Sequence, residues 1–450
     1  MLERNFEVEE VLELLEQKQF NKLKEYLGRI NGADFPSIFE ALDEKDMIII
    51  FRLLNKEEAA EIFAELDADL QEKLINSFSD AELKYVVDNL FMDDTVDMIE
   101  EMPSNVVKRI LKNVNEKDRK VINEILNYPD DCAGSIMTTE FVDLKEDMTV
   151  DDAFAKIKKI GLKKETVYNC YVLDKNRKLL GVIDIKDLLI ADRTEKIKEL
   201  MDENIITVTT LDDKEDVAKI FDKYDYVALP VVDKEFRLVG IVTVDDAIDV
   251  MKEEASEDFE KMAAITPNED GYYKTPVIVH AKNRIVWLLF LMFSSIVTGA
   301  VITHYEQAFA ALPILVSFIP MIMGTGGNCG SQSSTLVIRG LAVDEIHSKD
   351  FLKVWWKEIR VAVIVGIIMA IVNCIRIYIQ YKDLQLGLVV GLTLIVTIMI
   401  SKSLGSMLPL ICKKLKLDPA IMAAPLISTM LDTCSVLVFF NIAVAIMHIK

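Results

Sequence analysis

The chain has 450 residues, of which 51% are hydrophobic, and a formal net charge of −22. The charge is unevenly divided, because residues 1–280 carry a balance of −28 and residues 281–450 a balance of +6. The acidic first part makes nucleic acid and anionic lipid improbable partners and favours cations, whereas the apolar second part is typical of membrane-spanning helices.

The first 130 residues are expected to form an acidic helical N-domain. The segment MLERNFEVEE has no apolar stretch behind a basic one, so we expect no signal peptide and a cytosolic location for residues 1–280. From Val8 to about Leu126, apolar positions recur at helical spacing in short runs. Breaks rich in Ser, Asp and Asn separate these runs and can cap the next helix. The pattern predicts an all-α superhelical stack.

Residues 131–250 contain an internal duplication. YVLDKNRKLLGVIDIKDLL at 171–189 returns as PVVDKEFRLVGIVTVDDAI at 230–248, an offset of 59 residues. Each copy predicts a strand, a DK turn, a second strand and a helix. The duplication resembles a tandem pair of CBS modules, which implies an α/β fold and a ligand-sensing regulatory unit.

A helix dense in carboxylates is expected to follow, within a connecting segment at 251–277. The run DDAIDVMKEEASEDFEKMAAI at 245–265 places acidic residues 246, 249, 253 and 257 on one face. Like charges at this spacing oppose helix formation, and bound cations would relieve the repulsion. A solvated helix is the alternative interpretation of the same run.

Residues 278–450 are expected to form a transmembrane domain of five helices in a lipid bilayer. The apolar segments are 285–303, 307–338, 361–375, 384–412 and 419–449. The second is long and rich in Pro and Gly, so we expect a kinked helix that ends in irregular backbone lining a cavity. Basic residues lie mostly on the side of the N-domain, which predicts a cytosolic N-terminal part and an external C-terminus.

One carboxylate stands out among the spans. Asp432 lies 13 residues past Pro419, near the middle of the bilayer if the helix begins at that proline. A carboxylate at such depth costs on the order of 3 kcal/mol and is a functional-site candidate. We expect no Lys or Arg at that depth to pair with it. One or two carboxylates suit Mg²⁺, which keeps its waters, better than Ca²⁺.

The order of these parts, with PMIMGTGGNCGSQSSTLVIRGLA at 320–342 and LDPAIMAAPLISTMLD at 417–432, resembles the MgtE family of magnesium channels. The resemblance implies a homodimer in the cell (inner) membrane with its pore between subunits and hydrated Mg²⁺ at Asp432. The resemblance also assigns five positions to the pore lining: Gly327, Asn328, Gly330, Ala424 and Pro425. Ala424 departs from the family pattern, because many relatives carry Gly or Asn there.

The resemblance also implies that cytosolic Mg²⁺ closes the pore by binding between the N-domain, the CBS pair and the connecting helix. The matching acidic positions are Glu61, Asp93, Asp97, Glu215, Asp225, Asp246, Asp249, Glu254, Glu257 and Asp258. ATP is a second expected ligand, because Thr243 and Asp246 fit the nucleotide motif of CBS modules. Capping of the following helix is an equal explanation for Thr243, and Asp184 replaces the hydroxyl in the first module.

Other functions remain open at this point. A broader carrier of Co²⁺, Mn²⁺ or Ni²⁺ would use the same chemistry as a Mg²⁺ channel. A CBS-gated anion channel conflicts with Asp432 and with the expected lack of embedded basic residues. A membrane sensor without transport leaves Asp432 unexplained. An enzyme is disfavoured, because the four histidines are dispersed and no nucleophile with a base is visible.

Overall fold

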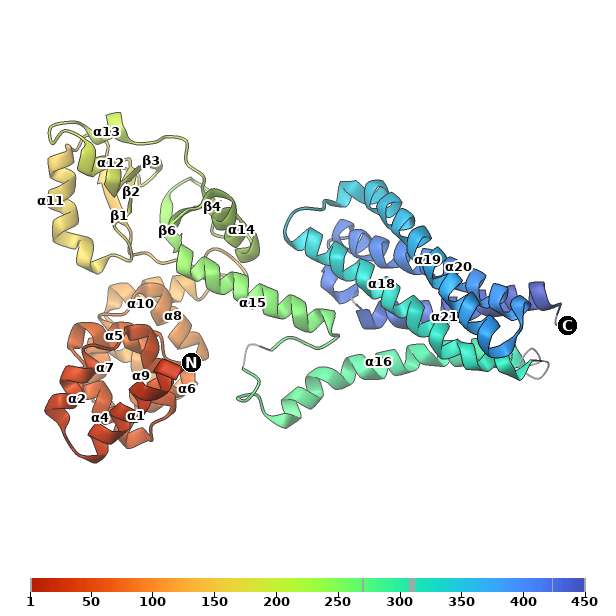
Figure 1. Ribbon diagram of the computed structural model, residues 1–450. Coiled ribbons are helices and arrows are strands. Elements are labelled where there is room, and N and C mark those ends of the chain that lie inside the picture. The colour runs from red at the N-terminus through yellow and green to blue at the C-terminus, as the bar shows by residue number, and fades with distance from the viewer. Residues whose placement is uncertain (1, 269–270, 307–311, 423, 449–450) are drawn as a thin grey trace. The chain divides into compact units, whose positions relative to one another are not determined.

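The computed structural model describes residues 2–268, 271–306, 312–422 and 424–448. The chain separates into two compact units, residues 1–251 and 252–450. The first unit holds the N-terminal helices and two small sheets, and the second holds the long apolar helices (Figure 1). This mixture of a helical stack, an α/β pair and a helical membrane domain confirms the expected fold class.

The N-domain is a stack of short helices, as the periodicity predicts. Its elements are α1 (Leu2–Glu16), α2 (Phe20–Leu27), η1 (Gly32–Asp34), α3 (Phe35–Glu40), α4 (Glu44–Leu53), α5 (Lys56–Ala64), α6 (Ala68–Ser77), α7 (Asp80–Val87), α8 (Met92–Glu101), α9 (Ser104–Asn113) and α10 (Glu116–Ile125). Each helix buries one apolar stripe in a shared core, so no short helix has to be stable alone.

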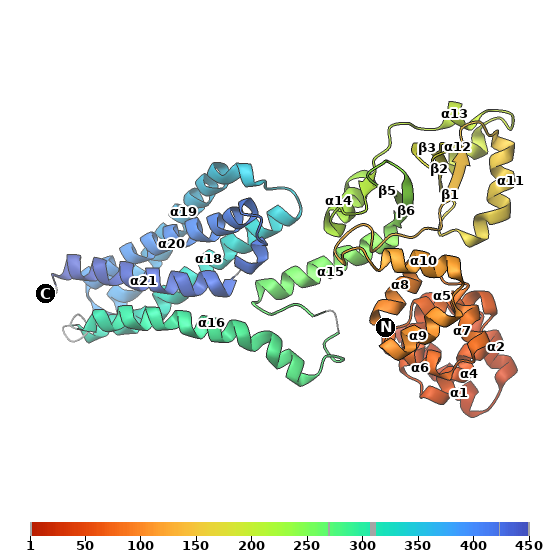
Figure 2. The same ribbon diagram turned by 180° about the vertical axis from the view of Figure 1, so that it is seen from behind.

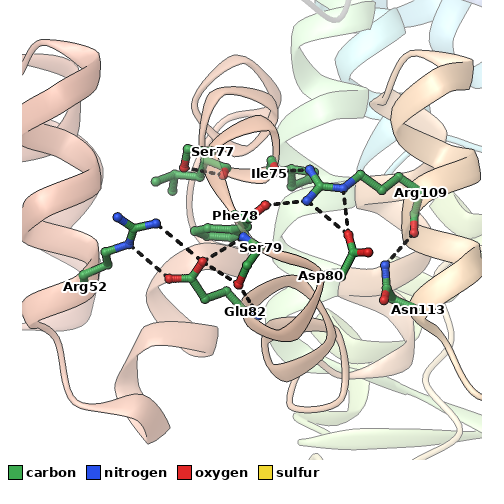
Figure 3. A network of polar contacts seen from close by, with 10 residues as sticks. Arg52, Ile75, Ser77, Phe78, Ser79, Asp80, Glu82, Arg109 and Asn113 are labelled. Atoms are coloured by element: carbon green, nitrogen blue, oxygen red, sulfur yellow. Dashed lines mark hydrogen bonds and ion pairs between the residues drawn. The ribbon is translucent and has the colours of Figure 1, made fainter.

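Polar contacts connect helices that lie three apart in the chain (Figure 3). Ser79 and Glu82 form a capping box that begins α7, and Arg52 of α4 pairs with Glu82 at 3.0 Å. Arg109 of α9 donates to the carbonyl oxygens of Ile75, at 2.6 Å, and of Phe78. Arg109 thereby adds a charged donor at the end of α6, for the Ile75 carbonyl, which also accepts from the Phe78 N–H, and for the carbonyl of the C-cap residue Phe78.

The duplicated region forms two sheets of matching topology. The first module comprises β1 (Val142–Lys145), α11 (Val150–Ile160), η2 (Gly161–Lys163), β2 (Asn169–Leu173), β3 (Leu179–Asp184), α12 (Ile185–Ile190) and α13 (Ile197–Leu200). The second comprises β4 (Val208–Thr209), α14 (Lys214–Tyr224), β5 (Ala228–Val232), β6 (Leu238–Thr243) and α15 (Val244–Met262). In each sheet the first and second strands pair in parallel, and the second and third strands pair antiparallel (Figure 2).

The 59-residue offset is preserved in atomic detail. Val172 pairs with Gly181 and Val231 with Gly240, and each sheet has an irregularity at the next residue. Arg177 and Phe236 both adopt positive φ in the DK turns, where their backbones exchange hydrogen bonds with the other module. The two modules are therefore a pseudo-symmetric pair, as the duplication predicts.

The described residues of the second unit include five helices long and apolar enough to span a membrane. They are α16 (Val277–His304), α18 (Ile319–Ala342) with the preceding η3 (Pro313–Phe318), α19 (Phe351–Tyr381) preceded by η4 (Ser348–Asp350), α20 (Leu384–Lys414) and α21 (Ala424–Met447) preceded by η5 (Pro419–Met422). Helix α20 packs against α18, α19 and α21, and α16 packs against α21 (Figure 1).

The prediction of irregular backbone at the end of the second span is wrong. Helix α18 continues without interruption through Gly324, Gly326, Gly327 and Gly330, and the irregular part is η3 before it. Gly326, Gly327 and Gly330 serve close helix packing instead, because a side chain at any of them would collide with α20 or α21, whereas Gly324 faces open space. Residues 307–311 of the predicted span lie outside the described residues.

Candidate functional site

The first candidate site is a group of carboxylates in unit 1. Asp93, Asp94 and Asp97 lie on α8, two of them in its first turn, where the helix dipole favours negative charge. The N-domain core extends through Phe221, Val242 and other residues into the second CBS module. This shared core brings α8 within electrostatic reach of Asp246, near the start of α15.

The carboxylates perturb one another strongly. Burial raises the pKa of Asp93 well above its usual range, and repulsion from Asp246 and Asp94 adds to the shift. Burial and repulsion from Asp246 also raise the pKa of Asp94 to about 6 and that of Asp97, whose side chain still reaches solvent, to about 7. Burial raises the pKa of Asp246 to about 6 although a hydrogen bond from Thr243 opposes the shift. The cluster therefore concentrates unfavourable negative charge.

Glu165 is a member of this cluster that sequence reasoning missed. Burial and the charges of Asp94, Asp245 and Asp246 raise its pKa to about 8. Its Oε2 atom is buried and has no hydrogen-bond partner within the described structure. No local pattern singles out Glu165, because it lies in the loop after η2 and reaches the other carboxylates only through the tertiary fold.

The cluster has the donors for a hydrated cation but is not a direct cage. No salt bridge to Asp93, Asp94, Asp97 or Asp246 occurs in the part of the chain that the structure describes. Within that part, no three His, Cys, Asp or Glu side chains are close enough to hold a metal ion directly. Mg²⁺ keeps several waters and is commonly held by one or two carboxylates, so an orphaned carboxylate oxygen among like charges fits it.

The other predicted sensor positions lie at several places. Glu61 is exposed on α5, Glu215 of α14 pairs with Lys219 at 2.7 Å, and Asp225 is an exposed left-handed cap of α14. Asp249 is exposed in the first half of α15. The remaining three lie in the second half of α15, which belongs to unit 2: Glu254, Glu257 and Asp258. The structure thus brings together only Asp93, Asp97 and Asp246 among the predicted residues of unit 1.

Thr243 is engaged by Asp246 itself. Its hydroxyl donates to Asp246 Oδ2 at 2.6 Å where β6 passes into α15. The Thr243 backbone N–H also donates to Asp246 Oδ2, at 3.4 Å, so it is Asp246 that accepts at the start of α15, and capping of the helix by the Thr243 hydroxyl stays a prediction. The sequence match of Thr243 and Asp246 to the nucleotide motif of CBS modules is unaffected by this contact.

The second candidate site surrounds Asp432. Helix α21 begins at Ala424 rather than Pro419, so Asp432 lies only eight residues, about 12 Å, into the helix. It is nevertheless within about 5 Å of the midpoint of this 24-residue helix. No salt bridge to Asp432 occurs among the described residues, and its side chain is only partly buried in the protomer.

The remaining pore positions lie on α18 and at the start of α21. Gly327 and Gly330 are buried where α18 meets Ser428 and Leu431 of α21, whereas Asn328 is exposed on the protomer surface. Ala424 and Pro425 begin α21, and the side chain of Ala424 lies outside the described part.

The expectation that no basic residue is embedded in the helices is wrong. Lys402 of α20 is 5% exposed, and its Nζ atom lies 3.6 Å from a carboxylate oxygen of Glu358. Glu358 lies two turns inside α19. Lys402 interrupts an otherwise uncharged stretch from 384 to 412, which is the same signal that drew attention to Asp432.

Comparisons with known proteins cover nearly the whole chain. Residues 319–442 match the MgtE model, described as a divalent cation transporter, and residues 30–131 match the MgtE intracellular N domain. Residues 133–193 and 197–253 each match a CBS domain. The magnesium transporter MgtE of Bacillus subtilis is 32% identical over 438 residues, 97% of each chain. That of Thermus thermophilus is 31% identical over 434 residues, 96% of each chain.

Solved structures resemble the first unit. The soluble part of a magnesium transporter superposes with a TM-score of 0.53 at 31% identity and covers 56% of this chain and 99% of its own. The cytosolic domain of the Mg²⁺ channel MgtE in complex with ATP gives 0.51 at 31% identity, over 54% of this chain and 99% of its own. With the full-length relatives, these matches confirm the resemblance that the motifs suggested, and the chain belongs to the MgtE family of magnesium transporters.

Proposed function

We propose that this protein lets Mg²⁺ enter the cytosol down its electrochemical gradient and closes when cytosolic Mg²⁺ is high. The observation that carries the transport assignment is Asp432, a carboxylate near the middle of an apolar helix with no basic partner among the described residues. Glu358 of α19 is a contrast, because Lys402 Nζ lies 3.6 Å from its carboxylate. An unneutralised carboxylate at such a depth favours a passing cation.

Mg²⁺ is the ion that this arrangement suits best. A homodimer would place two copies of Asp432 around one axis, enough for an ion that retains its water shell. Asn328 is exposed on the protomer, which supports a pore between subunits rather than within one. With the N-terminal part in the cytosol and five spans, the C-terminus is external, and an inward divalent ion gains roughly 2.3 kcal/mol per charge per 100 mV.

The sensor assignment rests on the cluster in unit 1. Burial and mutual repulsion make the ionised forms of Asp93, Asp97, Asp246 and Glu165 unfavourable, so Mg²⁺, which compensates ionised carboxylates, is favoured at this cluster. Loss of the ions at low cytosolic Mg²⁺ leaves a repulsive interface between the N-domain and the second CBS module. A ligand shifts such an equilibrium only by its differential affinity for the two forms.

A nucleotide site is the second part of the proposal. A relative's cytosolic domain has been solved with ATP. In this chain, Thr243 and Asp246 retain the motif in the second module, whereas Asp184 replaces the hydroxyl in the first. We assign ATP to the second module, where it would have to compete with the Thr243–Asp246 hydrogen bond.

Transport of Co²⁺, Mn²⁺ or Ni²⁺ is the alternative function, since the matching model is described as a divalent cation transporter. Flux into proteoliposomes distinguishes these ions directly. The test variant is Asp432→Asn, for which we expect at least a tenfold loss of Mg²⁺ flux with the oligomeric state unchanged. The matched control is Asp383→Asn at the N-cap of α20, where Asn caps as well as Asp. Wild-type flux through Asp432→Asn contradicts the pore assignment.

The sensor is tested on residues 1–262, which end with α15. Mg²⁺ should protect this fragment from protease more than K⁺ does at equal ionic strength, because screening depends only on ionic strength whereas binding depends on the ion. Asp93→Asn with Asp246→Asn should lose this difference. Asp249→Asn with Glu257→Gln tests whether the acidic face of α15 contributes. Equal protection in both salts would show that the carboxylates are only a solvated surface.

A further inference from the structure

The buried lysine of the membrane domain is not explained by ion conduction at Asp432. Lys402 lies in α20 between Ser401 and Ser403, and its side chain is 6% exposed. A lysine without a counter-charge in such surroundings would be strongly unfavourable. Its position therefore requires a partner inside the bundle.

Three helices supply that arrangement. Ser333 of α18 donates its hydroxyl to Glu358 of α19 at 2.6 Å and accepts a hydrogen bond from Lys402 of α20 at 3.1 Å. The Lys402 ammonium is 3.6 Å from the same Glu358 oxygen. Ser333 is fully buried, and Glu358 is 13% exposed. One hydroxyl thus links two opposite charges across three helices.

The helices joined at this point also share apolar clusters, and α19 and α20 share one further hydrogen bond nearby, from Trp355 Nε1 to Ser403 Oγ at 3.3 Å. One turn before Ser333, Gly330 of α18 meets the backbone at Gly405 of α20, and a side chain at Gly405 would overlap the Gly330 carbonyl. Such glycine contacts allow the helices to approach closely but select their axial position only weakly. Apolar contacts with lipid are equally favourable in any register and do not select it either. A polar pair at one level is the best-attested means of specifying register in packed helices.

The axial position of α18 also determines which of its residues lie level with Asp432 of α21. Gly330 lies against Leu431, the residue before Asp432, and Gly327 lies against Ser428. A shift of α18 along α20 would displace Gly327, Asn328 and Gly330 relative to Asp432. The link between Ser333, Glu358 and Lys402 is therefore connected to the pore through one turn of α18.

We propose that Lys402, Glu358 and Ser333 form a buried electrostatic clamp that sets the register of α18 and thereby positions the pore face of that helix opposite Asp432. The three are positioning residues that act through α18 and do not contact the ion. The flux readout rests on the proposed Mg²⁺ conduction, so the test includes a second readout that does not.

That readout is the native thiol of Cys329, which α18 buries against Ala362 of α19 and Ile398 of α20. A change of register would expose it to a maleimide, and peptide mapping by mass spectrometry resolves it from the other cysteines. Lys402→Met and Glu358→Leu alone leave an uncompensated charge and are expected to unfold or lose flux. The deciding variant combines them, because apolar replacement of a buried ion pair commonly preserves the fold.

For the double variant we expect a folded protein with at least tenfold lower Mg²⁺ flux and several-fold faster labelling of Cys329. The charge-reversed pair Lys402→Glu with Glu358→Lys should restore protection of Cys329 and recover most of the flux. The control is Lys357→Met, an exposed position beside Glu358 on α19, which should change neither readout.

Wild-type flux and labelling in the double variant would overturn the clamp, because the pair would then be dispensable for register. Failure of the reversed pair to protect Cys329 would overturn it as well. If the wild-type protein itself carries no Mg²⁺, the proposed function fails, but labelling of Cys329 still decides whether the clamp sets the register.

Discussion

Neutralising Glu165 should stabilise the cytosolic unit when Mg²⁺ is absent. The side chain normally titrates near 4.5, and its pKa in the fold is about 8. At pH 7, which is about 2.5 units above the ordinary pKa, the unfolded chain gains free energy by ionising Glu165 and the folded chain does not. Each pH unit is worth about 1.4 kcal/mol, so the raised pKa costs the native state at most about 3.5 kcal/mol of stability. Coupling to neighbouring carboxylates and residual solvent reduce the expected gain from Glu165→Gln to about 1–2 kcal/mol, or roughly 3–6 °C.

The sign of the pH dependence follows from the raised pKa values. Asp94, Asp97, Asp246 and Glu165 bind protons more tightly in the folded than in the unfolded state. Stability should therefore rise as pH falls from about 8 through the folded pKa values, and the gain is complete only below the unfolded values near 4. Glu165→Gln should flatten this dependence between about pH 8 and pH 5.

The assay is thermal unfolding of residues 1–262 in chelator and in Mg²⁺ across this pH range. Mg²⁺ should stabilise the wild-type fragment more than the variant, because an ion that binds only the folded form adds stability in proportion to its affinity. Glu199→Gln, at an exposed position of α13 outside the cluster, is the control. A variant that is less stable than wild type at pH 7 without Mg²⁺, or that keeps the full pH dependence, would refute the repulsion argument.

Three further outcomes follow from packing and domain order. Arg109→Ala should lower the stability of the N-domain by about 1–3 kcal/mol in thermal unfolding, because the Ile75 carbonyl and the carbonyl of the C-cap residue Phe78 lose a charged donor, whereas exposed Arg119→Ala should not. Gly405→Ala should destabilise the detergent-purified protein by about 1–3 kcal/mol through collision with the Gly330 backbone, whereas Gly299→Ala, which meets no atom, should be neutral. Deletion of residues 1–130 should leave Mg²⁺ flux but raise the Mg²⁺ concentration needed to close the pore; closure over an unchanged range contradicts a sensor role for the N-domain.

Patterns that depend on local geometry were predictable from the sequence. Helical periodicity indicated the short helices of the N-domain, and the 59-residue duplication indicated two equivalent sheets, because both follow from the repeat of side chains along one backbone. Five long apolar runs indicated five spans for the same reason. Asp432 was recognisable because a charge in an uninterrupted apolar run is unfavourable wherever the helix lies.

Contacts between distant segments were decided only by the tertiary structure. Glu165 joins Asp94 and Asp246 through folding alone, so its raised pKa has no counterpart in its neighbours along the chain. Glycines in α18 were interpreted as breaks in the helix, since glycine weakens an isolated helix, but the packed bundle uses them to bring backbones together. Whether Lys402 would be a tolerated charge depended on Ser333 and Glu358, which lie on two other helices. Burial and charge compensation are properties of the assembled bundle, and a single chain segment carries neither.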